Sequence, residues 1–196
     1  MRDLGPEVLG PYLTLTVVLS HMVLGALGGL LIACVPGLDG DDGVTPLSLP
    51  VPEGLCVVCV RPSLRVDTEA ARDLLPERVL LSEAVTNAGR LTGLITSLFK
   101  GDLHLLGRCL DDCLVTPHRQ ALVPGFLEVT QAARHAGALG AGLSGSGPTV
   151  FALTAEVGVA HSVAEAMVQA FDGAGLEAAS FVSSVCPEGG RLETDL

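Results

Sequence analysis

The chain has 196 residues, of which 48% are hydrophobic and 17% are charged, so it can build a core and lacks the composition of a disordered protein. Lysine and arginine total 11 against 22 acidic residues, which gives a formal net charge of -11. A surface this acidic repels nucleic-acid backbones and anionic headgroups, which argues against nucleic acid as a partner. An anionic ligand would need a local positive site.

The stretch over residues 12–35 contains no charged side chain and is long enough to span a bilayer, which takes about 20 apolar residues. His21 near its middle, several glycines and the absence of a flanking basic cluster disfavour a transmembrane helix. The alternative is a strand or loop over 14–19, a buried helix, and a strand near 30–35. We favour this second interpretation and do not expect the membrane as a partner.

The next segment, over residues 35–54, is rich in Gly, Pro and Asp and has no periodicity, which predicts a loop or a boundary. The apolar run over 55–60 predicts a central strand. Asp67 or Thr68 caps a short helix that Pro76 stops. Ser82 caps a longer helix with a stripe of apolar residues, namely Ala84, Ala88, Leu91, Ile95 and Leu98.

In the second half of the chain, a helix is predicted over residues 103–114, and another is opened by Pro124 and closed by Gly137. A glycine-rich turn over 141–148 leads into a strand over 149–153. A helix around 163–171 and a final strand over 178–185 complete the pattern. Strands separated by helices, with the helices on one face of a sheet, predict an α+β fold.

Two close pairs of cysteines, with His104 and His118 nearby, raise the possibility of a zinc site. The first pair falls in a predicted strand, where positions three apart point to opposite faces. The second pair shares a predicted helix face, and buried free thiols behave as small hydrophobes. We therefore predict no metal site and reduced thiols in a cytoplasmic protein. The six cysteines are Cys34, Cys56, Cys59, Cys109, Cys113 and Cys186.

The strongest local signal is the segment GLSGSGPT over residues 142–149, where three glycines alternate with two serines. Such a backbone can turn sharply and expose N–H groups to an anion, although a tight connection between two elements has the same spacing. Gly140, Gly142 and Gly145 also satisfy the dinucleotide fingerprint. That interpretation is rejected because a helix precedes the motif and a strand follows it, the reverse of what it requires.

Two arginines stand out in a chain with so few basic groups. Arg72 lies on the short helix after Thr68, and Arg119 follows a Thr-Pro-His sequence. A guanidinium fork suits a carboxylate or a phosphate, but either arginine could equally pair with a surface acid. By default Thr68 is a helix cap, and His21 is a core histidine on an apolar face.

In order and spacing, these segments resemble homoserine kinases, which belong to the GHMP superfamily of small-molecule kinases. The resemblance covers about residues 55–185 and implies a GHMP kinase C-terminal domain, a ferredoxin-like α/β sandwich, over 54–196. Residues 1–53 would be a partial N-terminal segment and a linker. The matching features are VDTEAARDLLP at 66–76, Asn87, Arg90, Gly93, Asp111 or Asp112, PHR at 117–119, LVPGF at 122–126 and the glycine-rich run at 137–153.

The resemblance implies ATP-dependent phosphorylation of L-homoserine to O-phospho-L-homoserine, a step towards threonine, with ATP and Mg²⁺ as cofactors. Arg72 would act in catalysis, and no carboxylate base is implied. The substrate would be bound by Thr68, Arg72, Arg119 and His21, and the phosphate loop would be Ser144, Gly145, Ser146 and Gly147.

Two departures from the family pattern are visible. The family's ATP-binding motif, P-x-x-x-G-L-G-S-S-A, does not occur in the sequence, so the usual ligands for ATP and Mg²⁺ are not found. His21 matches the family's H-A-D-N segment, but its Asp and Asn have no counterpart. The alternative function is therefore a non-catalytic relative that binds an amino acid or a partner chain. Exposed apolar surface would favour association, including a homo-oligomer.

Overall fold

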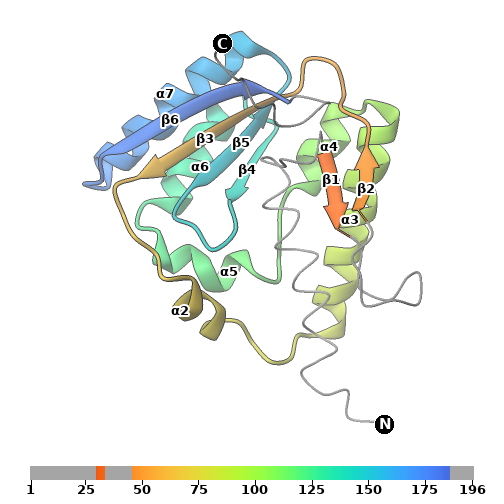
Figure 1. Ribbon diagram of the computed structural model, residues 1–196, viewed down its shortest axis with the longest axis horizontal. Coiled ribbons are helices and arrows are strands. Elements are labelled where there is room, and N and C mark those ends of the chain that lie inside the picture. Colours follow the sequence, from red (N-terminus) through yellow and green to blue (C-terminus); the bar gives the residue numbers. More distant parts are fainter. Residues whose placement is uncertain (1–29, 34–45, 186–196) are drawn as a thin grey trace, which may run out of the picture.

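A computed structural model describes residues 30–33 and 46–185 of the protein (Figure 1). The predictions for residues 14–29, including His21, lie outside these ranges, as do Cys34 and Cys186. Strand β1, Leu30–Ala33, agrees with the strand predicted near 30–35, and it pairs antiparallel with β2, Pro46–Leu49. The prediction of a loop over 35–54 was therefore wrong for the residues of β2. Its short Leu-Ser-Leu alternation is too brief to be told from a loop by pattern.

The main sheet has four antiparallel strands in the order β4-β5-β3-β6. These strands are β3, Cys56–Pro62; β4, Gly140–Leu143; β5, Val150–Thr154; and β6, Ala178–Ser184. Helices α6, Phe126–His135, and α7, Val157–Gly173, cover one face of the sheet (Figure 1). This β-α-β-β-α-β arrangement is the ferredoxin-like topology, so the α+β prediction is confirmed.

Each face of the sheet has its own apolar core. The first core lies under α6 and α7, and its centre is made of fully buried residues such as Val58, Val129, Met167 and Phe171. The second core lies on the opposite face, where Val57, Phe151 and Leu153 meet Leu94, Leu98 and Leu106. Cys56 belongs to the first core and Cys59 packs on the second, so the two thiols point to opposite faces as predicted.

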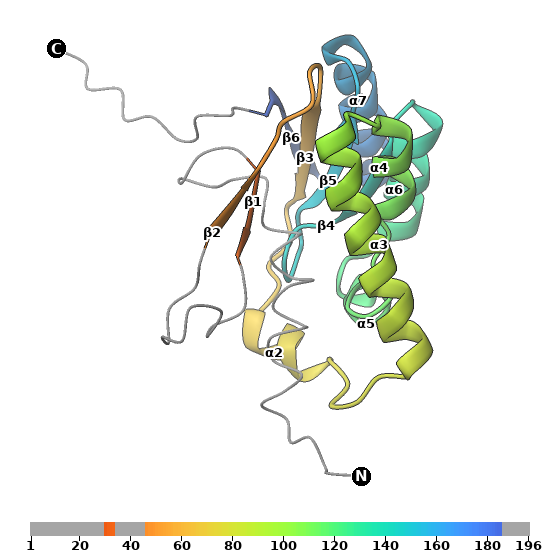
Figure 2. The same cartoon turned by 90° about the vertical axis from the view of Figure 1, so that its right-hand side faces the viewer.

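The connection between β3 and α6 carries the helices that build the second core and the candidate site. Figure 2 shows the longest of them, α3, running beside α4, with the β1–β2 pair on the far side of the sheet from α6 and α7. These elements are α2, Thr68–Asp73; α3, Leu81–Lys100; α4, Leu103–Cys109; α5, Thr116–Arg119; and the 3-10 helix η3, Gln120–Leu122.

The starts of two helices resolve the capping predictions. Asp67 is the cap of α2, since its Oδ1 accepts a hydrogen bond of 2.9 Å from the Ala70 N–H. Ser82 is not the cap of α3, because it already lies inside the helix. The N–H of Leu80 is instead accepted by the Glu83 carboxylate at 3.3 Å. A glutamate three residues into a helix can perform this task without a capping serine.

The helix predicted over 103–114 ends earlier, at Cys109. The carboxylate of Asp112 accepts three backbone N–H groups beyond it, and such local bonds compete with helix continuation. Cys113 therefore does not share a helix face with Cys109. Its thiol instead contacts the Asn87 side chain and the Glu83 carbonyl of α3.

The glycine-rich segment was predicted as a turn from residue 141, but it begins as strand β4, and the turn spans only 144–149. Gly142 fits this strand because a Cβ there would lie 3.1 Å from the Phe151 ring on β5. Gly145 and Gly147 have φ of +63° and +85°, which other residues rarely adopt. Pattern alone could not separate a glycine-rich edge strand from its turn.

No helix within residues 46–185 is long and apolar enough to cross a bilayer. Of the apolar stretch over 12–35, the structure describes residues 30–33, which form strand β1.

Candidate active site

A cavity of about 70 Å³ opens between α3, the α4–α5 connection and the β4–β5 hairpin. Apolar side chains such as Leu94, Leu143 and Phe151 form much of its wall. Its polar lining includes Asn87, Arg90, Asp112, Thr116 and Arg119, together with the backbone of Gly145. A mostly apolar hollow with a few convergent polar groups is the usual form of a small-molecule site.

Arg119 joins three parts of this site. It is the last residue of α5 and only 3% exposed. Its Nε donates to the carbonyl of Ala71 in α2 at 3.0 Å, and its Nη1 donates to the carbonyl of Gly145 at 3.4 Å. The guanidinium therefore ties α2 to the glycine-rich loop across the cavity wall.

The electrostatic surroundings of Arg119 favour an anion. Burial lowers the pKa of its guanidinium, and the nearby charge of Arg72 lowers it further, while the Asp112 carboxylate opposes them. Burial and a like charge both disfavour the positive form of a base. An anion bound beside the two arginines would stabilise the charged guanidinium and so oppose the lowering of its pKa.

The carboxylate of Asp112 accepts hydrogen bonds from the backbone that follows it. Its Oδ1 accepts the N–H of Leu114 at 2.9 Å, and its Oδ2 accepts those of Val115 and Thr116 at 2.9 and 2.6 Å. Both carboxylate oxygens are thus engaged at the start of α5, the helix that ends at Arg119. These local side-chain-to-backbone bonds hold the chain just ahead of α5, whose N-cap residue is Val115, and they leave the carboxylate poorly suited to act as a base.

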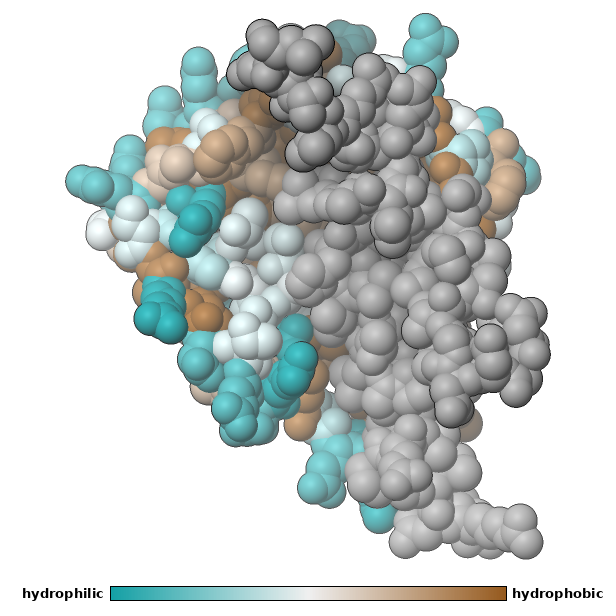
Figure 3. Space-filling model, viewed as in Figure 1, coloured by the Kyte–Doolittle hydropathy of each residue, from teal (hydrophilic) through white to brown (hydrophobic). Residues whose placement is uncertain are grey.

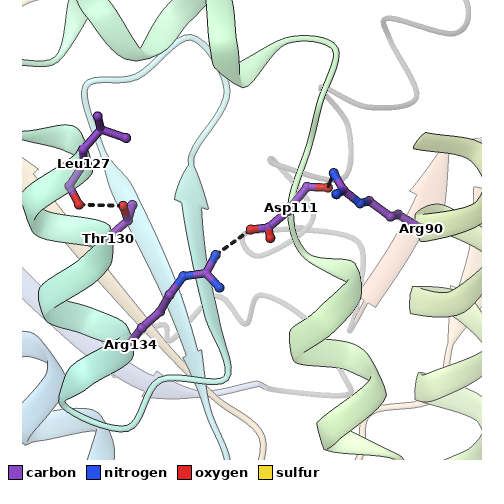
Figure 4. A network of polar contacts seen from close by, with 5 residues as sticks. All are labelled: Arg90, Asp111, Leu127, Thr130 and Arg134. Atoms are coloured by element: carbon purple, nitrogen blue, oxygen red, sulfur yellow. Dashed lines mark hydrogen bonds and ion pairs between the residues drawn. The ribbon is translucent and has the colours of Figure 1, made fainter. Parts of the chain in front are cut away.

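The neighbouring Asp111 is held from two sides (Figure 4). Arg134 of α6 forms an ion pair with its carboxylate, and Nη1 of Arg90 from α3 donates to its carbonyl at 3.1 Å. The connection between α4 and α5 is therefore fastened to the helices on both sides of it, which keeps the cavity wall in place.

Some backbone amides of the loop over 144–147 are already hydrogen-bonded within the hairpin and do not face an anion. The N–H of Ser144 donates to Thr149 at 2.9 Å, and that of Gly147 donates to the Ser144 carbonyl at 3.0 Å. The amides of Ser144 and Gly147 are therefore engaged within the hairpin itself. The hairpin is both a tight connection and a candidate phosphate loop, the two alternatives that the spacing left open.

The structure brings together some of the predicted site residues. Arg119 and Gly145 line the cavity, whereas Ser144, Ser146 and Gly147 belong to the same loop but not to the lining. Thr68 and Arg72 lie on α2, where both are exposed and outside the cavity lining. The residue of α2 that contacts Arg119 is Ala71, through its carbonyl. His21 lies outside the described residues.

Several polar lining residues were not predicted as site residues, namely Asn87, Arg90, Asp111, Asp112 and Thr116. Asn87 and Arg90 are one helical turn apart on α3 and carried no signal beyond the family spacing. Asp112 had a local signal, because a proline in the first turn of a short helix follows it in the sequence. Within residues 46–185, no three His, Cys, Asp or Glu side chains gather closely enough to hold a metal ion.

Comparison with known proteins assigns the class. Residues 94–173 match the family described as GHMP kinases C terminal, so the chain carries a GHMP kinase C-terminal domain. Leishmania major mevalonate kinase, solved with R-mevalonate, has the same fold at a TM-score of 0.61 and 18% identity, over 83% of this chain and 51% of that one.

Within this class the sequence is similar to homoserine kinases. The chain is 40% identical over 153 residues to the homoserine kinase of Chlorobium phaeovibrioides, which is 76% of this chain and 48% of the relative. It is 43% identical over 129 residues to that of Pyrococcus furiosus, covering 66% and 43%. The crystal structure of homoserine kinase from Cytophaga hutchinsonii superposes with a TM-score of 0.77 at 37% identity, covering 83% and 50%. The chain thus spans about half the length of these relatives.

The three backbone hydrogen bonds of Asp112 give a direct prediction. Asp112→Ala removes all three, and losing hydrogen bonds of this kind at the start of a helix costs about 1–2 kcal/mol, a drop of about 2–8 °C in the melting temperature. Asp112→Asn keeps an acceptor oxygen and should lose less than half as much, because asparagine forms the same kind of local backbone bond. Calorimetric melting of both variants checks this. Equal losses for alanine and asparagine would contradict the role of these bonds and point to a need for the negative charge.

Proposed function

We propose that the protein acts as a homoserine kinase, transferring phosphate from ATP, with Mg²⁺, to the side-chain hydroxyl of L-homoserine in the cytoplasm. The product would be O-phospho-L-homoserine, an intermediate in threonine biosynthesis. The part of the chain in residues 54–196, which we propose as one domain, would supply the amino-acid side of the active site. Residues 1–53 would be an N-terminal segment and linker.

The observation that carries the proposal is the buried Arg119 at the cavity wall, with the charge of Arg72 close enough to lower the pKa of its guanidinium. The chain has twice as many acidic as basic residues, so two arginines near one cavity form a locally positive site that suits an anion. L-Homoserine brings a carboxylate and its reaction brings a phosphoryl group, and both match a guanidinium. Similarity to homoserine kinases over about three quarters of the chain supports L-homoserine as the substrate.

Phosphoryl transfer depends mainly on positioning and on neutralising charge, so arginines and loop amides are suitable groups. Arg72 would meet the transferring phosphate region, and Arg119 would orient the amino acid with Thr68 and His21. The loop of Ser144, Gly145, Ser146 and Gly147 would close the phosphate end.

The residues of this chain match the binding of ATP and Mg²⁺ less well than the binding of the amino acid. The sequence lacks the family's ATP-binding motif, and the described residues offer no acidic cluster for Mg²⁺. We therefore assign no step of the transfer to nucleotide-binding groups in this part of the chain. The same observation favours one second candidate, a GHMP-fold protein that binds an amino acid or a partner chain without catalysis.

Calorimetric titration of the full chain with L-homoserine, and separately with Mg-ATP, tests the proposal. L-Homoserine should bind, and Arg72→Ala should raise its Kd at least about tenfold, since one charged hydrogen bond to a ligand contributes about 1.5–3 kcal/mol. Arg108→Ala, an exposed arginine on α4 outside the cavity lining, is the matched control and should leave the Kd unchanged.

The nucleotide arm separates the two candidates. Binding of Mg-ATP together with phosphate transfer to L-homoserine would establish the kinase. Binding of L-homoserine alone would favour the non-catalytic candidate for this polypeptide. Binding of neither ligand would contradict the kinase and the amino-acid-binding protein, and would leave only binding of a partner chain.

A further inference from the structure

Arg90 of α3 is partly buried in the wall of the cavity, and it forms no ion pair with the residues that the structure describes. Within that part of the chain, its side chain donates from Nη1 to the carbonyl of Asp111 at 3.1 Å. Many charged side chains need no protein partner, because they stand in water at the rim, as the hydrophilic side chains in Figure 3 do. Arg90 instead lines a hollow with a largely apolar wall, where a charge is less well solvated.

The acidic and thiol groups around Arg90 do not balance its charge. The carboxylate of Asp111 pairs with Arg134 of α6 (Figure 4), and that of Asp112 accepts three backbone N–H groups. Burial raises the pKa of the Cys113 thiol, and the positive charge of Arg90 only partly opposes this rise. The thiol is therefore protonated and neutral at neutral pH. The charge of Arg90 is left available to a ligand.

Arg90 also has more donors to offer than Arg119. Arg119 uses Nε and Nη1 on two backbone carbonyls, whereas Arg90 uses only Nη1. The carbonyl that Arg90 contacts belongs to Asp111, which Arg134 holds from the other side (Figure 4). This contact fixes one corner of the guanidinium and leaves Nε and Nη2 as a fork, which matches the oxygens of a carboxylate or a phosphate.

We propose that Arg90 is a further ligand-binding residue, which binds an oxyanion group of the ligand on the α3 side of the cavity. The inference rests on the proposed function for the identity of the ligand. L-Homoserine offers a carboxylate, and its phosphorylated product offers a phosphoryl group as well. Arg90 and Arg119 line the same cavity from α3 and α5, so the ligand would be held from two sides.

Calorimetric titration of the full chain with L-homoserine, and separately with inorganic phosphate, tests the inference. Arg90→Gln can still donate to the Asp111 carbonyl but has no charge. It should raise the Kd of at least one of the two ligands about tenfold or more, the effect of losing one charged hydrogen bond. Arg90→Lys keeps the charge without the fork and should recover part of the affinity. Arg108→Gln, at an exposed position of α4 outside the lining, is the matched control.

The two ligands identify the group that Arg90 binds. A higher Kd for L-homoserine alone assigns the carboxylate, a higher Kd for phosphate alone assigns the phosphoryl group, and a rise for both assigns one position that takes either. Melting curves verify that the variants are folded. Equal Kd values for Arg90→Gln and Arg108→Gln with each ligand, or equal losses for Arg90→Gln and Arg90→Lys, would overturn the inference.

The same titrations separate this inference from the proposed function. If L-homoserine binds equally well to Arg90→Gln and Arg108→Gln, and phosphate does too, the proposed function stands and the role of Arg90 is refuted. If phosphate binding depends on Arg90 and L-homoserine does not bind, the role of Arg90 stands and the proposed substrate is wrong. An unmodified chain that binds neither ligand would overturn both.

Discussion

Replacing Arg119 with alanine is expected to lower the free energy of unfolding by about 3–5 kcal/mol and to abolish measurable binding of L-homoserine. The side chain is buried and donates to the carbonyls of Ala71 and Gly145, which belong to different segments. Hydrogen bonds from a charged donor contribute about 1.5–3 kcal/mol each. Without them, α2 and the glycine-rich loop lose their common partner, and the anion site loses its buried charge.

Urea unfolding and calorimetric titration measure the two effects separately. Arg119→Lys keeps the charge, but a single ammonium cannot reproduce the fork that reaches both carbonyls, so it should recover less than half of the stability. The control is Arg134→Ala, which breaks only a half-exposed ion pair with Asp111 and should cost less than about 1 kcal/mol. A loss for Arg119→Ala no larger than that of Arg134→Ala would show that Arg119 does not join these segments.

Gly107→Ala is expected to have the second largest effect, a net loss of about 2 kcal/mol. A Cβ at this position would lie 2.4 Å from the carbonyl oxygen of Leu139 and 3.0 Å from its carbonyl carbon. Backbone atoms cannot move aside as a flexible side chain can, and overpacking costs about 1–3 kcal/mol or more. That cost should exceed the gain of about 1 kcal/mol that alanine has over glycine in a helix.

The effect should also reach the candidate site. α4 would have to move away from β4, and it leads directly into Asp111 and Asp112, so binding of L-homoserine should weaken as well. Gly89→Ala is the matched control: it lies in α3 with no atom within 4 Å of the added Cβ. It should raise stability by about 0.5–1 kcal/mol. Urea unfolding of both variants checks the contrast, and a stabilising Gly107→Ala would refute the close contact.

The fold class, the succession of most elements and the resemblance to homoserine kinases could all be predicted from the sequence. These properties depend on patterns within short windows: the apolar run of β3, the stripe along α3, and the Pro and Gly that border α6. The motif around Ser144 and Gly145 is equally local, so it was visible before any coordinates. The roles of Thr68, Arg72, Arg119 and His21 stay predictions.

The way the candidate site is built could not be predicted from the sequence, because it depends on contacts between distant segments. Arg119 looked like a surface arginine or a ligand, but it reaches Ala71, 48 positions away, and Gly145, 26 positions away. Asp112 and Asn87 meet the same cavity from separate segments. β6 pairs with β3, although the two strands are far apart in the chain, and no second strand among the described residues pairs with β6. Such contacts arise from packing between distant segments, and local patterns carry little information about them.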